Sequence, residues 1–169
     1  MGDIQSLLDR NEDLTFDRVR NLSDKTNKDS VGEKIASFAT SRGGIILFGQ
    51  DNDKKIAGIG MQDDDFIHRL GELAEMLDPR PTLDGPYFYD AEGKRLAVLK
   101  VISLGKGGPC CYRDTAYRRN MDRSEKIPPK ELHRIWSSIG QLHFEERPSE
   151  APLSAIDRES FDIYSNQAK

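Results

Sequence analysis

The strongest chemical signal in the sequence is an excess of positive charge between residues 94 and 134. This segment holds eleven Lys and Arg against four Asp and Glu, a net charge of +7, whereas the whole chain carries −4. Such a concentration of cations favours a polyanionic ligand, because neutralising phosphates supplies most of the sequence-independent affinity for nucleic acids. The residues that we expect to contact nucleic acid are Lys106, Arg113, Arg118, Arg119, Arg123, Lys126, Tyr112 and Tyr117.

The two tyrosines of this set lie among the arginines, where their rings could stack on bases. The alternatives are an ordinary solvated charged face and a basic surface that meets an acidic protein partner. Residues 106–126 hold their cations on a loop and two short extended segments, where several side chains can point the same way. We therefore expect this region to carry binding to any nucleic-acid sequence, with a strong dependence on salt.

Three acidic residues, Glu12, Asp17 and Asp51, form a second candidate site. They approach one another if an N-terminal strand near residues 14–19 pairs beside a strand at 45–48. Oxygen ligands of this kind suit Mg²⁺ or Mn²⁺ ions that position a phosphodiester. The alternative, which we favour, is that these carboxylates serve solubility and helix caps. We therefore assign no catalytic and no metal-binding residue, and keep the three acids only as candidates.

No cofactor-binding pattern stands out in the sequence. Cys110 and Cys111 are adjacent, and together with three scattered histidines they give no zinc-site spacing. The glycine-rich segment 105–109 is followed by extended chain and lacks the order G-x-x-x-x-G-K-[ST] of a phosphate-binding loop. We expect no cofactor within this chain, with Mg²⁺ or Mn²⁺ required only if the chain is a nuclease.

The composition is that of one polar domain without a membrane segment. Of the 169 residues, 36% are hydrophobic and 32% are charged, which is typical of a soluble chain. No apolar run approaches the roughly 20 residues that a membrane span requires, and the acidic N-terminus does not resemble a secretion signal. Adjacent cysteines are poor candidates for a structural disulfide. We predict a cytoplasmic protein with no membrane partner.

The element that must position these residues is a strand at 45–48, where four apolar residues lie between glycines. Such a run predicts a central strand that is buried on both faces. Ahead of it, Ser30 and Glu33 form a capping box for a helix over 31–42. After it, residues 55–59 predict a second strand, which forms a hairpin with the first.

The rest of the chain predicts further helices and one more hairpin. The further elements are helices over 63–77 and 129–139, a hairpin of 82–89 with 94–102, short extended segments at 110–113 and 116–119, and a helical turn at 4–10. In the second strand of the hairpin, Lys100 interrupts an otherwise apolar run. The predicted fold class is α/β, a mixed and mostly antiparallel sheet of two hairpins plus an N-terminal strand, packed with about three helices.

The composition changes after residue 143. Residues 144–152 are polar and contain two prolines, and a weak amphipathic turn follows near 156–164. We predict one domain over 1–143, followed over 144–169 by a linker with a short C-terminal helix that leads to a downstream domain.

The order of motifs in residues 31–59 resembles the Schlafen AlbA-like domain family. The similarity rests on Ala-Ser-Phe-Ala-Thr at 36–40, Gly-Gly-Ile-Ile-Leu-Phe-Gly at 43–49, an Asp-bearing turn, Ile-Ala-Gly-Ile at 56–59, a proline, strand and Tyr-x-Arg segment over 109–119, and an exit segment at 144–148. It extends over about residues 12–150. The resemblance implies an α/β domain that binds DNA or RNA. In this family the domain is often N-terminal in bacterial ATP-binding transcriptional regulators, with a downstream ATPase domain, and in Schlafen proteins it is an RNA-cleaving module.

One departure from the family bears on catalysis. The family's N-terminal strand commonly reads Glu-x4-Glu-Phe-Lys, and its nuclease version uses the Glu pair with a later Asp to hold a divalent metal. Here Arg10 and Thr15 stand at the two Glu places, and Asp17 stands at the Lys place. Thr15 cannot act as an anionic metal ligand, and only Asp51 stands near the place of the third acid. The resemblance therefore implies little nuclease activity, unless neighbouring acids substitute through a register shift.

These patterns together predict a nucleic-acid-binding module. The alternatives are a metal-dependent endoribonuclease and a protein-interaction module, of which a homodimer is one form. Among the cations the resemblance favours Arg119 over Arg118, because Arg119 occupies the arginine place of the Tyr-x-Arg segment. Arg118 then alternates to the opposite face of the strand.

Overall fold

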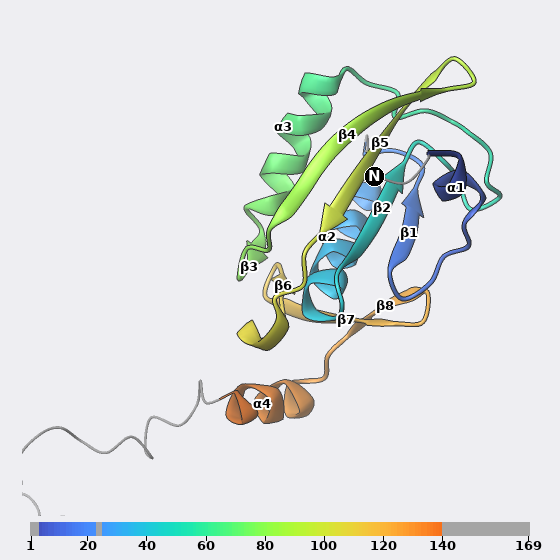
Figure 1. The fold of residues 1–169 in the computed structure, drawn as a ribbon. Coiled ribbons are helices and arrows are strands. Elements are labelled where there is room, and N and C mark those ends of the chain that lie inside the picture. Colours follow the sequence, from blue (N-terminus) through green and yellow to red (C-terminus); the bar gives the residue numbers. More distant parts are fainter. Residues whose placement is uncertain (1–3, 23–24, 140–169) are drawn as a thin grey trace, which may run out of the picture.

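The structure is a computed structural model that describes residues 4–22 and 25–139. These residues form a mixed α/β fold with two four-stranded sheets (Figure 1). The helices are α1 (Ile4–Asp9), α2 (Lys25–Thr40), α3 (Asp63–Ala74) and α4 (Pro129–Ser138), with a 3₁₀ turn η1 (Gly105–Gly107). The strands are β1 (Phe16–Val19), β2 (Gly44–Phe48), β3 (Leu77–Asp78), β4 (Leu83–Ala91), β5 (Lys94–Val101), β6 (Cys111–Tyr112), β7 (Thr115–Asn120) and β8 (Arg123–Lys126).

The first sheet has the strand order β1-β2-β5-β4, with β2 inside it. β1 and β2 are parallel, since the α2 crossover lies between them, whereas β2–β5 and β5–β4 are antiparallel. Ile46, Leu47 and Phe48 of β2 have no exposed surface and Ile45 is half-buried. The predicted central strand and the predicted hairpin of 82–89 with 94–102 are thus confirmed.

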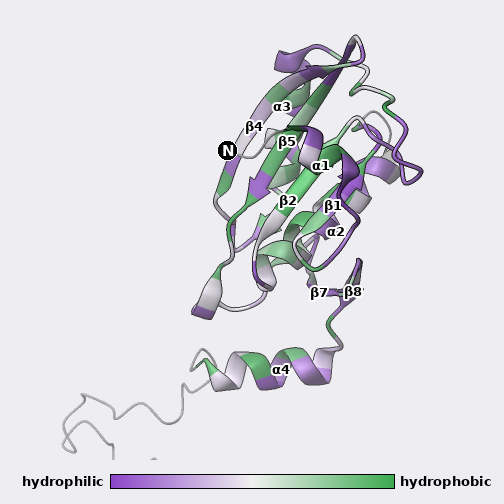
Figure 2. Ribbon diagram, turned by 45° about the vertical axis from the view of Figure 1, so that its right-hand side comes forward, coloured by the Kyte–Doolittle hydropathy of each residue, from purple (hydrophilic) through white to green (hydrophobic). Residues whose placement is uncertain are grey.

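The two faces of this sheet are buried under different helices. The face toward α2 and α3 packs Ile46, Phe48 and Leu99 into the larger core. On the opposite face Leu47 and Phe16 pack beneath α1. Figure 2 shows β2 in green over most of its length, within the first sheet. A strand covered on both faces needs the unbroken apolar run seen in the sequence.

The second sheet has the order β3-β6-β7-β8 and packs along α2. β6 and β7 are the two extended segments predicted at 110–113 and 116–119, and they pair antiparallel. β8 and the two-residue β3 were not predicted. The sheet approaches α2 at Gly32, where an added Cβ would lie 2.4 Å from the ring of Tyr112. Glycine at this helical position therefore makes room for the sheet.

The predicted hairpin of 45–48 with 55–59 is wrong. Residues 55–59 form no strand, and Ile56 makes a single antiparallel bridge to Gln50. The backbone instead curls around Gly49, whose carbonyl accepts hydrogen bonds from the N–H groups of Ala57 (2.8 Å) and Gly58 (2.9 Å). The antiparallel neighbour of β2 is β5, which begins 50 positions after the start of β2 and pairs its Val101 with Gly44.

Two helix boundaries also differ from the prediction. α2 begins at Lys25, so the predicted capping pair Ser30 and Glu33 lies inside the helix. Its first turns are polar and carry no apolar periodicity, which concealed them. α3 ends at Ala74, before Leu77, because Leu77 leaves the helix to pair with Tyr112 in the second sheet.

α4 lies at the predicted position, and its apolar residues are only partly covered by the rest of the fold. None of its ten residues, all within the described part of the chain, is buried. Figure 2 shows green and purple residues side by side along it. Trp136 lies against the η1 turn, since an added Cβ at Gly108 would be 2.7 Å from its ring. The apolar periodicity of this helix predicts that one face is buried, and in this structure that face is only partly buried.

The predicted linker and C-terminal helix over 144–169 lie outside the described residues. Within residues 4–22 and 25–139, the longest apolar stretch in any helix is too short to cross a lipid bilayer.

Candidate nucleic-acid interface

Five of the predicted contact residues are cations at or near the surface: Lys106, Arg113, Arg118, Arg123 and Lys126. The Arg123 side chain at the start of β8 is 85% exposed, and its Nε lies 3.8 Å from Asp122. Lys106 on η1 and Lys126 at the end of β8 are exposed. Lys106 and Lys126 have no ion pair among the described residues, and Arg123 has only its long, exposed pair with Asp122, so a ligand can reach all three charges.

The other two surface arginines are already engaged. Arg113 forms an ion pair with Asp29 at 3.0 Å. Arg118 contacts Glu131 of α4 and lies 3.6 Å from Glu125. A phosphate that contacts either arginine would compete with a carboxylate.

Tyr112 and Tyr117 are not available for base stacking in this structure, which corrects the role expected for them. Both side chains are 4% exposed and pack against α2. Tyr112 Oη donates to Asp29 at 2.8 Å, and Tyr117 Oη donates to Glu33 at 2.9 Å. Their rings therefore fasten the second sheet to α2, and the exposed positions between the arginines hold no tyrosine ring.

We expect Tyr112 and Tyr117 to ionise late in an alkaline titration. Burial, followed by donation to a carboxylate, raises the pKa of each to about 12. The phenol is the favoured form, so its contribution to stability is complete below pH 10 and is lost as the pH rises through about 12. Ultraviolet absorbance should show fewer phenolates near pH 11 in the folded protein than in urea. The double variant Tyr112→Phe/Tyr117→Phe should lose this late step, and a titration near pH 10 for both rings would contradict their burial.

Arg119 is the buried residue of the Arg118–Arg119 pair, the reverse of the expectation. Its side chain has no exposed surface. Nη1 donates to Asp17 Oδ2 at 2.6 Å, and Nε donates to the carbonyl of Asp13 at 3.2 Å. The guanidinium also lies 4.7 Å from the centre of the Phe38 ring. The predicted alternation along β7 is thus present, but Arg119 holds the two sheets together and presents no donor to solvent.

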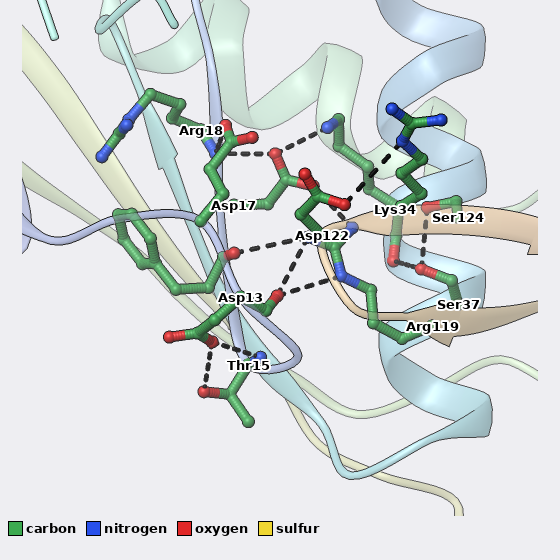
Figure 3. Close-up of polar contacts among 12 residues, drawn as sticks. Asp13, Thr15, Asp17, Arg18, Lys34, Ser37, Arg119, Asp122 and Ser124 are labelled. Carbon is green, nitrogen blue, oxygen red and sulfur yellow. Dashed lines mark hydrogen bonds and ion pairs between the residues drawn. The ribbon is translucent and has the colours of Figure 1, made fainter.

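Glu12 lies beside Asp17, the residue that pairs with Arg119. Figure 3 shows Asp17 together with its two cationic partners, Lys34 and Arg119. Asp17 is fully buried, and its Oδ1 accepts a hydrogen bond from Lys34 Nζ at 2.6 Å. Glu12 Oε1 accepts one from the Arg18 N–H at 3.2 Å. Partial burial, and then the neighbouring charge of Asp17, raise the pKa of Glu12.

Asp51 does not join this pair, so the three candidate acids are not brought together. It lies on the turn after β2, where its Oδ1 accepts the N–H of Lys55 at 2.8 Å. Across residues 4–22 and 25–139 there is no group of three His, Cys, Asp or Glu side chains placed to share a metal ion. The two carboxylate oxygens of Asp17 instead form ion pairs with Lys34 and Arg119.

The sequence did not single out a hollow of about 410 Å³ on the α1 face of the first sheet. Its lining includes Arg10, Thr15, Arg42, Ile45, Lys100 and Ile102. Arg10 Nη2 donates to Thr15 Oγ1 at 2.6 Å, so the two positions that the resemblance matched to a pair of Glu residues are in contact. The signal in the sequence was Lys100, the lysine within an apolar strand.

Comparisons with known proteins place the fold and the family. The model of the family described as "Schlafen, AlbA_2" matches residues 12–128. The crystal structure of the DIP2311 protein from Corynebacterium diphtheriae superposes with a TM-score of 0.56 at 14% sequence identity. That match covers 80% of this chain and 27% of the DIP2311 chain, so this chain spans about a quarter of that protein's length. No curated protein matches the sequence.

Proposed function

The chain belongs to the Schlafen AlbA_2 family, and from that membership we propose that it is a nucleic-acid-binding domain that contacts phosphates through an exposed basic edge. The observation that carries the proposal is the open charge of Lys106, Arg123 and Lys126. Arg123 and Lys126 belong to β8, an edge strand of the second sheet, where a ligand can approach without displacing another strand. DNA and RNA are both candidate ligands.

Contacts of this kind act on the phosphate backbone and carry no base preference. The buried positions of Tyr112 and Tyr117 remove the stacking residues that the sequence offered. The proposal therefore concerns affinity rather than sequence recognition. It includes no cleavage step, because Asp17 is neutralised by two cations and Asp51 lies apart from it.

Replacing Arg123 and Lys126 together by alanine should weaken binding to every nucleic acid tested. Each phosphate contact contributes about −0.9 to the slope of log K against log salt for duplex DNA, and about −0.7 for a single strand. The double variant should therefore flatten the slope by roughly one to two units. Fluorescence anisotropy with labelled DNA and RNA, titrated at several salt concentrations, measures both quantities.

The matched control is the double variant Lys55→Ala/Arg80→Ala, which removes the same charge at exposed positions. Arg80 follows β3, at the opposite edge of the second sheet from β8, and Lys55 lies on the turn after β2. This control should keep the wild-type slope. Equal losses in both double variants would show only an effect of net charge, and a wild-type protein that binds no nucleic acid at low salt would overturn the proposal.

A further inference from the structure

We propose that the hollow on the α1 face of the first sheet holds one nucleotide unit of a single strand, with its phosphate at Arg42, Lys100 and Arg10. This inference rests on the proposed function, which it extends to a second surface and to a ligand form. None of these three residues belongs to the basic edge at β8. The hollow measures about 410 Å³, within the range of small-ligand sites in proteins.

The hollow exists because α1 covers only part of its face of the sheet. Figure 1 shows α1 near the ends of β1 and β2 that lie away from the α2–β2 turn. Where β2 begins and β5 ends, Ile45 stands opposite Lys100 in the strand register; Ile45 is half-buried and Lys100 is exposed. The exposed side chain of Ile102 continues this surface. Ile45 and Ile102 thus form an apolar floor of the hollow, and Lys100 projects beside them.

The glycines of the α2–β2 turn shape the wall of the hollow. Gly43 has φ +76°, a conformation that favours glycine, and an added Cβ would lie 2.7 Å from the Val101 carbonyl. At Gly44 an added Cβ would meet the Phe38 ring at 2.5 Å. The backbone of the turn is thus packed closely against β5 and against Phe38 of α2, which fixes the position of this wall.

Three cations from separate segments border this floor. Arg10, after α1, is held in place by Asp13 at 2.9 Å and by Thr15 at 2.6 Å. Arg42 is exposed, and within the described ranges its side chain has no hydrogen bond or ion pair. Lys100 lies 3.8 Å from Asp84, a weak pair on the surface.

The charges around the hollow favour an anion. Asp13 and Asp84 offset Arg10 and Lys100, which leaves the charge of Arg42 uncompensated. A phosphodiester carries one negative charge and would match that excess. The Arg10 guanidinium is also fixed over the Phe16 ring at 5.0 Å, so little of its freedom remains to be lost when a ligand binds.

An apolar floor beside cations suits a nucleotide better than an isolated phosphate ion. The sugar or base can cover Ile45 and Ile102 while the phosphate meets the cations. A duplex keeps its bases stacked inside and cannot place one on the floor, whereas a single strand presents unstacked units. A free mononucleotide has the same chemistry, and the experiment separates the two sources.

The test compares Arg42→Ala and Lys100→Ala with Lys55→Ala, which removes an exposed lysine at the other end of the sheet. The probes are a labelled single-stranded oligonucleotide, measured by anisotropy, and UMP, measured through the ¹H–¹⁵N NMR signals of Gly43 and Gly44. We expect Arg42→Ala and Lys100→Ala each to weaken strand binding about threefold to tenfold and to reduce the salt slope by about 0.7. Lys55→Ala should bind as the wild type does. In the wild type, the strand should shift the Gly43 and Gly44 signals.

The possible outcomes separate this inference from the proposed function. Strand binding that is unchanged in both hollow variants, with Gly43 and Gly44 signals that do not move, overturns the hollow and leaves the basic edge standing. If UMP moves those signals and Arg42→Ala abolishes the shift, while neither the single strand nor a duplex of the same sequence binds, the hollow is a site for free nucleotides and the proposed function fails. If neither probe binds the wild type, the inference about the hollow is overturned, and the duplex titrations described above decide the basic edge.

Discussion

Replacing Arg119 by methionine is expected to lower the free energy of unfolding by about 3–5 kcal/mol. The substitution removes one partner of a fully buried ion pair and leaves Asp17 with an uncompensated oxygen. It also removes two hydrogen bonds to the Asp13 carbonyl. Lys34 still pairs with the other oxygen of Asp17, which should keep the loss at the lower end of this range. Urea denaturation followed by circular dichroism measures the change.

The neighbouring arginine provides the control. Arg118→Met removes the same charge from the exposed face of β7 and should cost about 1 kcal/mol or less, as surface pairs do. The variant Asp17→Asn/Arg119→Met should recover part of the loss, because it removes both buried charges. If Arg119→Met kept its stability and lost nucleic-acid binding, the guanidinium would be a ligand contact and the burial described above would be wrong.

Gly32→Ala is expected to destabilise the protein by about 1–3 kcal/mol, although alanine is the better helix former. The added methyl would lie 2.4 Å from the Tyr112 ring, inside the contact between α2 and the second sheet. Tyr112 is held by its bond to Asp29 and cannot turn away without breaking it. Thermal unfolding or urea denaturation gives the difference.

Gly71→Ala is the matched control, because Gly71 lies in α3 and no heavy atom comes within 4 Å of its added Cβ. Here the intrinsic preference should act alone and stabilise the protein by up to about 1 kcal/mol. Opposite signs for the two substitutions are the expected result. A gain of stability in Gly32→Ala would mean that the second sheet does not pack on α2 as described.

The strands with the clearest sequence patterns were the best predicted. The apolar run at 45–48 predicted burial on both faces. The hairpin of β4 and β5 was predicted from two extended segments joined by a short polar turn. The prediction for residues 55–59 failed because Gly58 interrupts their apolar residues, and its φ of +81° lets the chain curl back onto Gly49. Neither the hydrophobic periodicity nor the strand propensity of a segment indicates which strand pairs with β2, since that contact is long-range.

The candidate site was less predictable than the fold, because exposure depends on partners that are distant in sequence. The Tyr-x-Arg segment distinguished Arg119 from Arg118, but nothing near it in the sequence indicated that Arg119 would be buried, since its partner is the distant Asp17. Likewise Tyr117 is hidden by its contact with Glu33 on α2. Only Lys100 was distinguished by its local sequence, as a charge in an apolar strand. Its place in a candidate site became clear only from the fold, which brings Arg42 and Arg10 to the same hollow.

The contact between Asp17 and Arg119 spans 102 residues and therefore orders events during synthesis on the ribosome. β1, α2, β2 and β5 all emerge before β7 exists, so the first sheet can assemble while Asp17 has Lys34 as its cationic partner. N-terminal parts of a chain generally fold first as they emerge. In the nascent first sheet the Asp17 carboxylate would pair with Lys34 alone, and its second ion pair would form only when β7 emerges with Arg119. A ribosome stalled before residue 115 should therefore carry a loosened and protease-sensitive domain.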